Sequence, residues 1–289
     1  MKRQITLLLL ATLLINGAQA KTFIFDANDT TVYFSRSVAM RNQLADTQFS
    51  KAFIAYCFET KQNPYSAYKN IQKRAFAVLD NYCQSIKDIS LNGSFSGNEK
   101  MPALMSQMLR GDYSELAGQL HGRLAVDLFA KQNKFISRNE RIIVTKIIHL
   151  MFCSNALTPI IYPFEDTLKA IKKLSKEVDQ KGNKKHQIFI LSNMQNEVYE
   201  KMKTHKPLKK LFKYIPESNW IISGKINMIK PNNDIFEYVL NTFNLDIKDC
   251  VFVDDQKENI DAAAKLGFKT IHCTDDRKKV IQQLETFAQ

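Results

Sequence analysis

The chain has 289 residues, 45% of them hydrophobic and 24% charged, with a formal net charge of +12. This length is enough for one large core, or for a core with a second domain. Beyond the first twenty residues no stretch is apolar enough to span a membrane, which argues against a protein with several membrane spans.

The positive excess is rich in lysine and concentrated at 169–185 and 201–213. Such a surface is compatible with binding to anions, membrane phospholipid or nucleic acid. Solvated helix faces are the favoured interpretation, so neither a membrane surface nor a nucleic acid is the expected partner.

Residues 1–20 have the features of a secretory signal peptide. Lys2 and Arg3 precede an almost wholly apolar run over 5–15. The segment closes on Ala18-Gln19-Ala20, a small-x-small cleavage pattern. The apolar run is about a dozen residues, short of the roughly 20 that a bilayer span needs. We therefore expect an exported protein, periplasmic or secreted, that begins near Lys21 and has no transmembrane segment after signal removal.

The mature part contains five cysteines, and an odd count in an oxidising compartment leaves at least one unpaired. Cys57 and Cys83 fall in neighbouring predicted helices and form the favoured disulfide pair. Cys250 and Cys273 fall at opposite ends of two successive strands, which places them too far apart to bond. The spacing of the cysteines and histidines argues against a structural metal site.

The stretch from Lys21 to Thr30 predicts a buried strand that carries a carboxylate to a crevice. Its apolar, β-prone residues Phe23 to Phe25 end abruptly at Asp26, and small and polar residues follow. This pattern is typical of a buried strand in a parallel sheet, whose carboxyl end opens on a crevice.

Residues 36–157 predict one helix after another. Apolar residues recur at helical spacing over 35–60, and Pro64 fits the first turn of a second helix that runs to about 89. The composition of 92–98 predicts a loop. Further helices are expected at 102–110, 113–132 and 137–154, and their aromatic and Met residues are interpreted as core packing. Because this block interrupts the sheet after its first strand, we expect it to lie over the crevice.

From Thr158-Pro159 onward, apolar strands alternate with amphipathic helices. Strands are expected at 187–191, 220–223, 250–253 and 268–272. The alternation predicts an α/β fold, a three-layer doubly wound parallel sheet with a Rossmann-like core and helices on both faces. In such sheets function gathers beyond the carboxyl ends of the strands. The strand ends here carry Asp26, Ser192 with Asn193, and Asp254 with Asp255, and Lys230 precedes a helix in the same half.

In this order, these segments resemble the four motifs of the haloacid dehalogenase-like (HAD) hydrolase superfamily, most of whose members are phosphatases with an aspartate nucleophile. Asp26-Ala27-Asn28-Asp29-Thr30 is similar to the family's Asp-x-Asp-x-Thr, and Ile188 to Asn193 to its apolar strand ending in Ser-Asn. Lys230-Pro231-Asn232 is similar to its Lys-Pro-Asp, and Val251 to Ala263 to its Asp-Asp motif leading into a helix.

The resemblance covers 21–30 and 159–289, and the block at 36–157 matches the family's inserted helical cap by position only. With the signal peptide predicted at 1–20, the chain divides into a core formed by 21–35 and 158–289 and an all-helical cap domain at 36–157.

The resemblance implies a Mg²⁺-dependent phosphatase or phosphotransferase that acts on a small phosphorylated substrate. Asp26 would attack phosphorus and form an aspartyl-phosphate intermediate. The metal would be held by Asp26, the backbone carbonyl of Asn28 and Asp254, an oxygen donor set that suits Mg²⁺. Asp255 would support the loop or a water bound to the metal.

The same resemblance assigns four residues to the phosphate. The Ser192 hydroxyl would bind a phosphate oxygen, with Thr30 and Asn193 beside it in the substrate-binding set. Lys230 would pair with Asp26 and with the phosphate as a compact point charge.

Asn28 departs from the phosphatase pattern. The family's phosphatases place a second aspartate here, as general acid for the leaving group and base for water. Asparagine cannot exchange a proton, and losing such a group removes roughly 10²–10⁴-fold in rate.

Three functions therefore remain open. They are a phosphatase for good leaving groups such as acyl phosphates, a protein that binds phosphorylated ligands with little turnover, and a dehalogenase-like hydrolase. The last is disfavoured by Asp254-Asp255, because halide displacement needs no metal and an acidic pair opposes the departing halide. Substrate identity and oligomeric state have no recognisable motif in the sequence.

Overall fold

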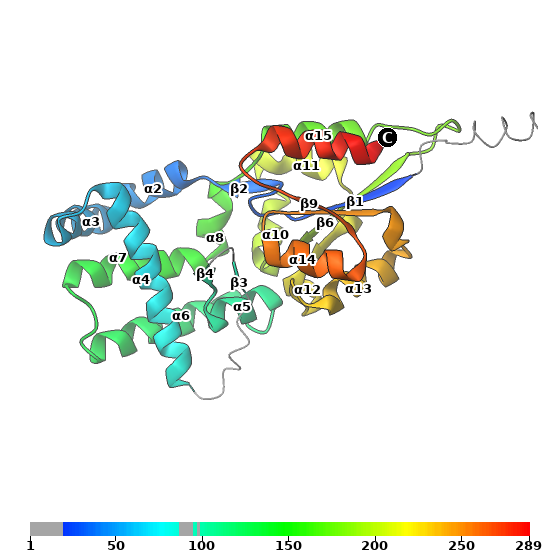
Figure 1. Cartoon of the computed structure of the whole chain (residues 1–289). Helices are drawn as coiled ribbons and strands as arrows, with labels where there is room; N and C mark the ends of the chain where they lie inside the picture. The colour runs from blue at the N-terminus through cyan, green and yellow to red at the C-terminus, as the bar shows by residue number, and fades with distance from the viewer. Residues whose placement is uncertain (1–19, 87–94, 97–98) are drawn as a thin grey trace, which may run out of the picture.

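The protein is described by a computed structural model that covers residues 20–86, 95–96 and 99–289. Apart from Ala20, the predicted signal peptide lies outside the described residues. The described residues form an α/β core, on the right of Figure 1, and a mainly helical cap, on the left.

A five-stranded parallel sheet with the strand order β7-β6-β1-β8-β9 forms the centre of the core. The strands are β1 (Lys21–Phe25), β6 (His186–Ser192), β7 (Trp220–Ile222), β8 (Cys250–Asp254) and β9 (Lys269–His272). In the central strand β1, Phe25 is paired with Ile190 of β6 and Val253 of β8. The carboxyl ends of β1, β6 and β8 therefore reach the same edge of the sheet, as predicted from the alternating pattern.

Helices cover both faces of the sheet, which confirms the predicted three layers (Figure 1). Because side chains alternate along a strand, Phe23 and Phe25 pack into one layer and Ile24 into the other. The first layer contains α9 (Glu165–Leu174), α10 (Asn196–Met202), α11 (Lys209–Tyr214) and α15 (Arg277–Ala288). The second contains α12 (Ser223–Ile226), α13 (Asn233–Phe243) and α14 (Lys257–Leu266). Short 3₁₀ turns complete the core at Thr158–Ile160, Lys206–Leu208, Glu217–Asn219 and Ile247–Asp249.

The cap helices pack around a hydrophobic core of their own, in which Ile71, Leu79 and Ile143 are fully buried. The helices are α2 (Arg36–Ala45), α3 (Thr47–Thr60), α4 (Pro64–Ser85), α5 (Ala103–Arg110), α6 (Glu115–Lys131), α7 (Arg138–Phe152) and α8 (Ser154–Leu157). The α4 helix begins where the side chain of Asn63 accepts a hydrogen bond from the Ser66 N–H, with Pro64 in the first turn.

The cap differs from its predicted form in two places. The helix expected over 35–60 is divided at Asp46, whose side chain accepts hydrogen bonds from the N–H groups of Gln48 and Phe49 and so starts α3. The loop expected at 92–98 falls partly outside the described residues. The strand β3 (Phe95–Ser96) lies within this range and pairs antiparallel with β4 (Glu99–Lys100), which follows it. The cap is therefore not all helical.

The two segments that connect core and cap run side by side. The strand β2 (Val32–Phe34) pairs antiparallel with β5 (Ile161–Pro163) in a small separate sheet. Phe34 therefore leaves the core next to the point where Ile161 returns to it. The prolines at 159 and 163 predict a break in the helices here, but not this pairing.

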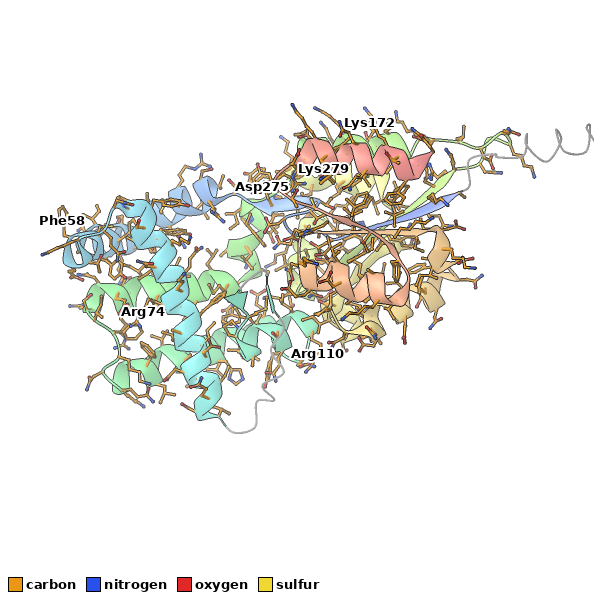
Figure 2. All side chains as sticks on the ribbon, in the orientation of Figure 1. Phe58, Arg74, Arg110, Lys172, Asp275 and Lys279 are labelled. Atoms are coloured by element: carbon orange, nitrogen blue, oxygen red, sulfur yellow. The ribbon has the colours of Figure 1, made fainter. Side chains whose placement is uncertain are left out.

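A second contact joins cap helix α5 to core helix α12. The Ser223 hydroxyl donates to the Leu109 carbonyl at 2.5 Å and accepts from the Met194 N–H at 2.8 Å. Gly111, with φ +89°, follows α5, and a Cβ atom there would lie 2.6 Å from the Gly224 carbonyl oxygen. This approach requires glycine at position 111. Figure 2 shows Arg110, its neighbour, on the core-facing side of the cap.

The five cysteines are all free, so the predicted Cys57–Cys83 disulfide is wrong. Cys83 is buried in the cap core and Cys57 is only half-buried, because sequence spacing places both on helices without fixing which way each points.

No single helix within the described ranges is long and apolar enough to cross a membrane. The α7 helix with the segment 154–160 meets that test only as a pair bent by 93°. Lys172 and Lys279, which belong to the basic excess, point outward from α9 and α15 (Figure 2).

Candidate active site

Asp26, Lys230 and Asp254 meet at the carboxyl edge of the sheet. The Lys230 ammonium donates to Asp26 Oδ1 at 2.6 Å and to Asp254 Oδ2 at 2.7 Å. All three side chains are buried, with Lys230 only 1% exposed. One ammonium group therefore lies between two buried carboxyl groups. With both carboxyl groups ionised, the three side chains would carry a net charge of about −1.

The electrostatics of this group follow from burial and from close charges. Burial raises the pKa of Asp26 well above its usual range; the Lys230 charge opposes that rise, and the charges of Asp254 and Asp255 add to it. Burial lowers the pKa of the Lys230 ammonium, but the charges of Asp254 and Asp26 outweigh it, so the net shift is upward. Lys230 is therefore a fixed positive charge beside Asp26.

Asn193 holds the backbone of Lys230 in place. Its side-chain Oδ1 accepts from the Lys230 N–H at 2.9 Å, and its Nδ2 donates to the Lys230 carbonyl at 2.9 Å. Both polar ends of the amide thus bind the backbone of one residue, on the two sides of its Cα atom. Asn193 therefore positions Lys230, and its predicted part in substrate binding stays a prediction.

The two adjacent aspartates that follow β8 have different surroundings. Asp254 Oδ1 accepts from the Gln256 N–H at 2.8 Å and from Asn259 Nδ2 at 3.0 Å, and its Oδ2 accepts from Lys230. Asp255 is half-buried, and its carboxylate is 3.5 Å from the Thr30 hydroxyl. Burial, then the charge of Asp254, raises the pKa of Asp255 to about 7.

The predicted metal-ligand set of Asp26, the Asn28 carbonyl and Asp254, with Asp255 beside it, stays a prediction. Both Asp254 oxygens accept hydrogen bonds from the protein, whereas the Asp255 carboxylate has a longer contact with the Thr30 hydroxyl. Across residues 20–86, 95–96 and 99–289, no three His, Cys, Asp or Glu side chains are grouped to hold a metal ion by themselves. Mg²⁺ needs only one or two carboxylates, because waters complete its octahedron. The crowded acids, with one lysine among them, fit such a cation.

Arg277 at the start of α15 secures the loop that follows β1. Its guanidinium donates to the Asp29 carbonyl at 2.6 Å and to the Thr30 carbonyl at 2.8 Å. It also donates to the Thr167 hydroxyl at 3.0 Å, and its Cζ lies 3.3 Å from the centre of the Phe164 ring. Asp29 has a left-handed backbone, with φ +54°, so these bonds fix a loop conformation that non-glycine residues rarely adopt.

Two predicted residues carry polar atoms without a partner among the described residues. The Ser192 hydroxyl is fully buried at the end of β6, and the Asn28 Oδ1 atom is buried in the loop after β1. A buried polar atom without a partner is costly, and at a site it indicates a group that arrives with the ligand. Thr30 is also buried, but its backbone is held by Arg277.

A cavity of about 280 Å³ lies between the core and the cap. Asp26, Asn28, Asn193 and Lys230 line it from the core side, whereas Thr30, Ser192, Asp254 and Asp255 lie outside its lining. The cap thus covers this part of the crevice. Gln256 and Asn259 also line it, and sequence reasoning missed both. Their signal is their place directly after the acidic pair, Gln256 at the N-cap of α14 and Asn259 in its first turn. Arg277 has no comparable signal.

Comparisons with known proteins match part of the sequence to a family and the structure to a fold. The family model for haloacid dehalogenase-like hydrolase matches residues 130–273, which include Lys230 and both acids but not Asp26. A HAD family enzyme from Bacteroides thetaiotaomicron has a TM-score of 0.51 and 16% identity, and the match covers 91% of this chain and 98% of that one. A haloacid dehalogenase-like family hydrolase from Xanthomonas campestris has a TM-score of 0.53 and 11% identity, with 94% of each chain covered. At these identities the solved structures establish the fold.

A curated protein matches a short segment. Over 49 residues the chain is 39% identical to drimenol cyclase DrtB of Aspergillus calidoustus. The segment is 17% of this chain and spans only 9% of the cyclase, so it says nothing of the cyclase's activity in this chain.

Proposed function

We propose that this chain, a haloacid dehalogenase-like hydrolase, is a Mg²⁺-dependent phosphatase or phosphotransferase that works through an aspartyl-phosphate intermediate. The observation that carries the proposal is the position of Asp26. It projects into a cavity from the end of the central strand, with a lysine ammonium 2.6 Å away and two further acids beside it. We also propose that the substrate is small and that the protein acts after export.

The proposed reaction has two displacement steps. A carboxylate oxygen of Asp26 attacks phosphorus in line, the bond to the leaving-group oxygen breaks, and the leaving group departs with its electron pair. Water or an acceptor alcohol then attacks phosphorus of the aspartyl phosphate, and the bond from phosphorus to the Asp26 oxygen breaks. Inorganic phosphate (from water) or a new phosphate ester (from an alcohol) leaves, the proton of the attacking oxygen passes to solvent, and the Asp26 carboxylate is restored. Lys230 offsets negative charge on the phosphate oxygens, because its ammonium is held charged between two carboxylates.

Asp26, the Asn28 carbonyl and Asp254 are the proposed ligands of the metal, and Asp255 would hold the loop or a water bound to the metal. When bound, Mg²⁺ would supply positive charge to the phosphoryl oxygens and orient the group for attack. The Ser192 hydroxyl, which has no partner among the described residues, is the proposed donor to a phosphate oxygen.

Asn28 sets the proposed substrate range. It lines the cavity where the family's phosphatases have a proton donor, so the leaving group must depart without protein-supplied proton transfer. Acyl and aryl phosphates have leaving groups acidic enough to do so, whereas alkyl phosphates do not. We therefore propose that this enzyme acts on activated phosphates.

The experiment is a phosphate-release assay on residues 21–289 with Mg²⁺. We expect acyl and aryl phosphates to react at least about 100-fold faster than alkyl phosphates, the lower bound for loss of a general acid. Chelation should abolish the activity. Release of halide from haloacids that persists in chelator would instead establish a dehalogenase. Ligand-induced stabilisation without phosphate release would establish a binding protein.

Replacement of Arg277 with alanine tests how the catalytic loop is held. We expect kcat on an acyl phosphate to fall about 10- to 100-fold, because a misplacement of about 1 Å at the nucleophile can cost 10² in rate. Arg277→Lys should restore only part of the loss, since one ammonium cannot reproduce the two-pronged contact with Asp29 and Thr30.

Lys278→Ala is the matched control, because Lys278 is the exposed neighbour on the same helix. The measurements are kcat and the thermal midpoint of each variant. Unchanged kcat in Arg277→Ala would show that the loop keeps its shape without the arginine.

A further inference from the structure

All the polar side chains that line the cavity with Asp26 come from the core or from the Gln195 position, and the cap side of the lining is apolar. The cap contributes only phenylalanine, methionine and leucine side chains to the described lining, from α4, α5, α7 and α8 and the residue at position 101. They include Phe76, Met105, Leu109, Met151 and Phe152. These side chains form the surface that faces the part of a substrate beyond its reacting group.

The charged side chains that line the cavity already contact each other. Among the lining residues described, the ionisable ones are Asp26 and Lys230, and they contact each other at 2.6 Å. A substrate with a second charged group, such as a carboxylate or an ammonium, would bury that charge among apolar side chains without a partner. Burial of an unpaired charge is strongly unfavourable.

Hydrogen-bonding capacity on the cap side is equally limited. Gln195 lies where the core meets the cap, and its Nε2 is 3.4 Å from the carbonyl oxygen of Met151 in the cap. Its Oε1 is buried without a partner among the described residues. That oxygen suits one hydroxyl or N–H donor. A sugar body would bring several hydroxyl groups, and those left unpaired would each weaken binding.

We infer that the cavity takes a phosphorylated substrate whose body is compact, uncharged and apolar, with at most one hydrogen-bond donor beyond the phosphate. The inference rests on the proposed function for the reacting end, and on the cap lining for the body. A volume of about 280 Å³ matches a single ring or a short branched chain. It lies at the lower end of small-molecule sites, below the larger sites that extended ligands occupy.

The test compares 4-ethylphenyl phosphate with O-phosphotyrosine. Both have a para-alkyl phenol as leaving group, and only the second carries an extra ammonium and carboxylate. We expect kcat/KM to be at least about tenfold higher for 4-ethylphenyl phosphate, from the cost of burying unpaired charge. From phenyl to 4-methylphenyl to 4-ethylphenyl phosphate it should rise up to about fourfold per carbon, the factor for ~0.8 kcal/mol per buried CH₂. Equal or reversed values would overturn the inference and leave the phosphatase proposal intact.

A binding experiment separates the inference from the proposed function. In Asp26→Asn, titration calorimetry should show tighter binding of 4-ethylphenyl phosphate than of O-phosphotyrosine. If the unmodified protein releases phosphate from neither compound, the proposed function fails, but this comparison still decides the nature of the cavity. Weaker or equal binding of the apolar compound would overturn the inference.

Met105→Gln tests whether the cap lining contributes to the preference for an apolar substrate. It introduces an amide of similar length into the lining of α5, and we expect kcat/KM for 4-ethylphenyl phosphate to fall about tenfold. Acetyl phosphate, whose body is too short to reach the cap, should be affected much less. The control is Leu116→Gln, which changes a 77% exposed side chain on the cap surface. Equal loss for both substrates, or no loss for either, would overturn the role of the cap lining.

Discussion

Replacing Asp26 with asparagine is expected to abolish phosphate release, with a fall in kcat of roughly 10⁴-fold or more, as for other nucleophiles removed from hydrolases. An amide cannot attack phosphorus to form the acyl-phosphate intermediate. The fold should persist, because asparagine keeps the shape of the side chain and Lys230 retains its 2.7 Å contact with Asp254. The measurements are single-turnover phosphate release and transfer of labelled phosphate to the protein from an acyl phosphate.

The matched control for Asp26→Asn is Asp261→Asn on α14, which removes one exposed carboxylate outside the lining of the cavity. It should leave kcat unchanged. Phosphate release at the unmodified rate in Asp26→Asn would contradict the nucleophile assignment, and would return the 2.6 Å contact with Lys230 to a structural role.

Substitution of Lys230 is a less informative test of the catalytic site than Asp26→Asn. Its removal would leave two buried carboxylates without a counter-charge, at a cost of about 3–5 kcal/mol in folding stability. A loss of activity there would confound chemistry with unfolding. Asp26→Asn, by contrast, leaves one buried lysine paired with one buried aspartate.

Replacing Asn28 with aspartate is expected to raise turnover of poor leaving groups. Aspartate is nearly the same size as asparagine, so the change adds a proton donor to the cavity without altering its packing. The rate on alkyl phosphates should rise by about 10²–10⁴-fold, the usual contribution of a general acid. For acyl phosphates kcat/KM should change little, because it reports the first displacement, in which their leaving group needs no proton. The measurement is kcat/KM for a series of phosphates ordered by leaving-group acidity.

Asn241→Asp on α13 is the control for Asn28→Asp, because it adds the same charge at an exposed site. In the unmodified protein and in Asn241→Asp, the rate should depend steeply on the acidity of the leaving group. In Asn28→Asp this dependence should become shallow. If the slope stays the same, Asn28 does not occupy the acid position, and another proton donor has to be sought.

The core and the centre of the site were predictable from the sequence for a physical reason. A buried parallel strand is a short apolar run, and parallel strands present their carboxyl ends at one edge. That rule alone brings Asp26 and Asp254 together with Asn193, before any contact is known. The same rule predicts where the helices inserted after the first strand lie, because the chain leaves that strand at the carboxyl edge of the sheet.

The remaining parts depend on contacts that periodicity does not encode. Arg277 reaches the loop after β1 from a helix far along the chain, and nothing about its neighbours in sequence marks it. The methionines at positions 105 and 151 have the spacing of core residues, and whether such residues face the core or a cavity depends on how the cap sits. The direction of the Asn193 amide is likewise set by the backbone N–H and carbonyl of Lys230, which a strand pattern does not predict.

The place of β1 in the sheet has a consequence for how the molecule is assembled. The strand comes from the start of the folded chain, yet its neighbours β6 and β8 are supplied much later; Lys21 and Asp249, which form an ion pair at 2.8 Å, are 228 residues apart. Closing so long a loop costs chain entropy before any contact repays it. The cap core, made from contiguous residues, has no such requirement. We therefore expect the cap to fold before the catalytic edge, which is complete only when β8 pairs with β1. A chain that ends before β8 lacks Asp254 and Asp255, so we expect it to be inactive even where β1 is paired with β6.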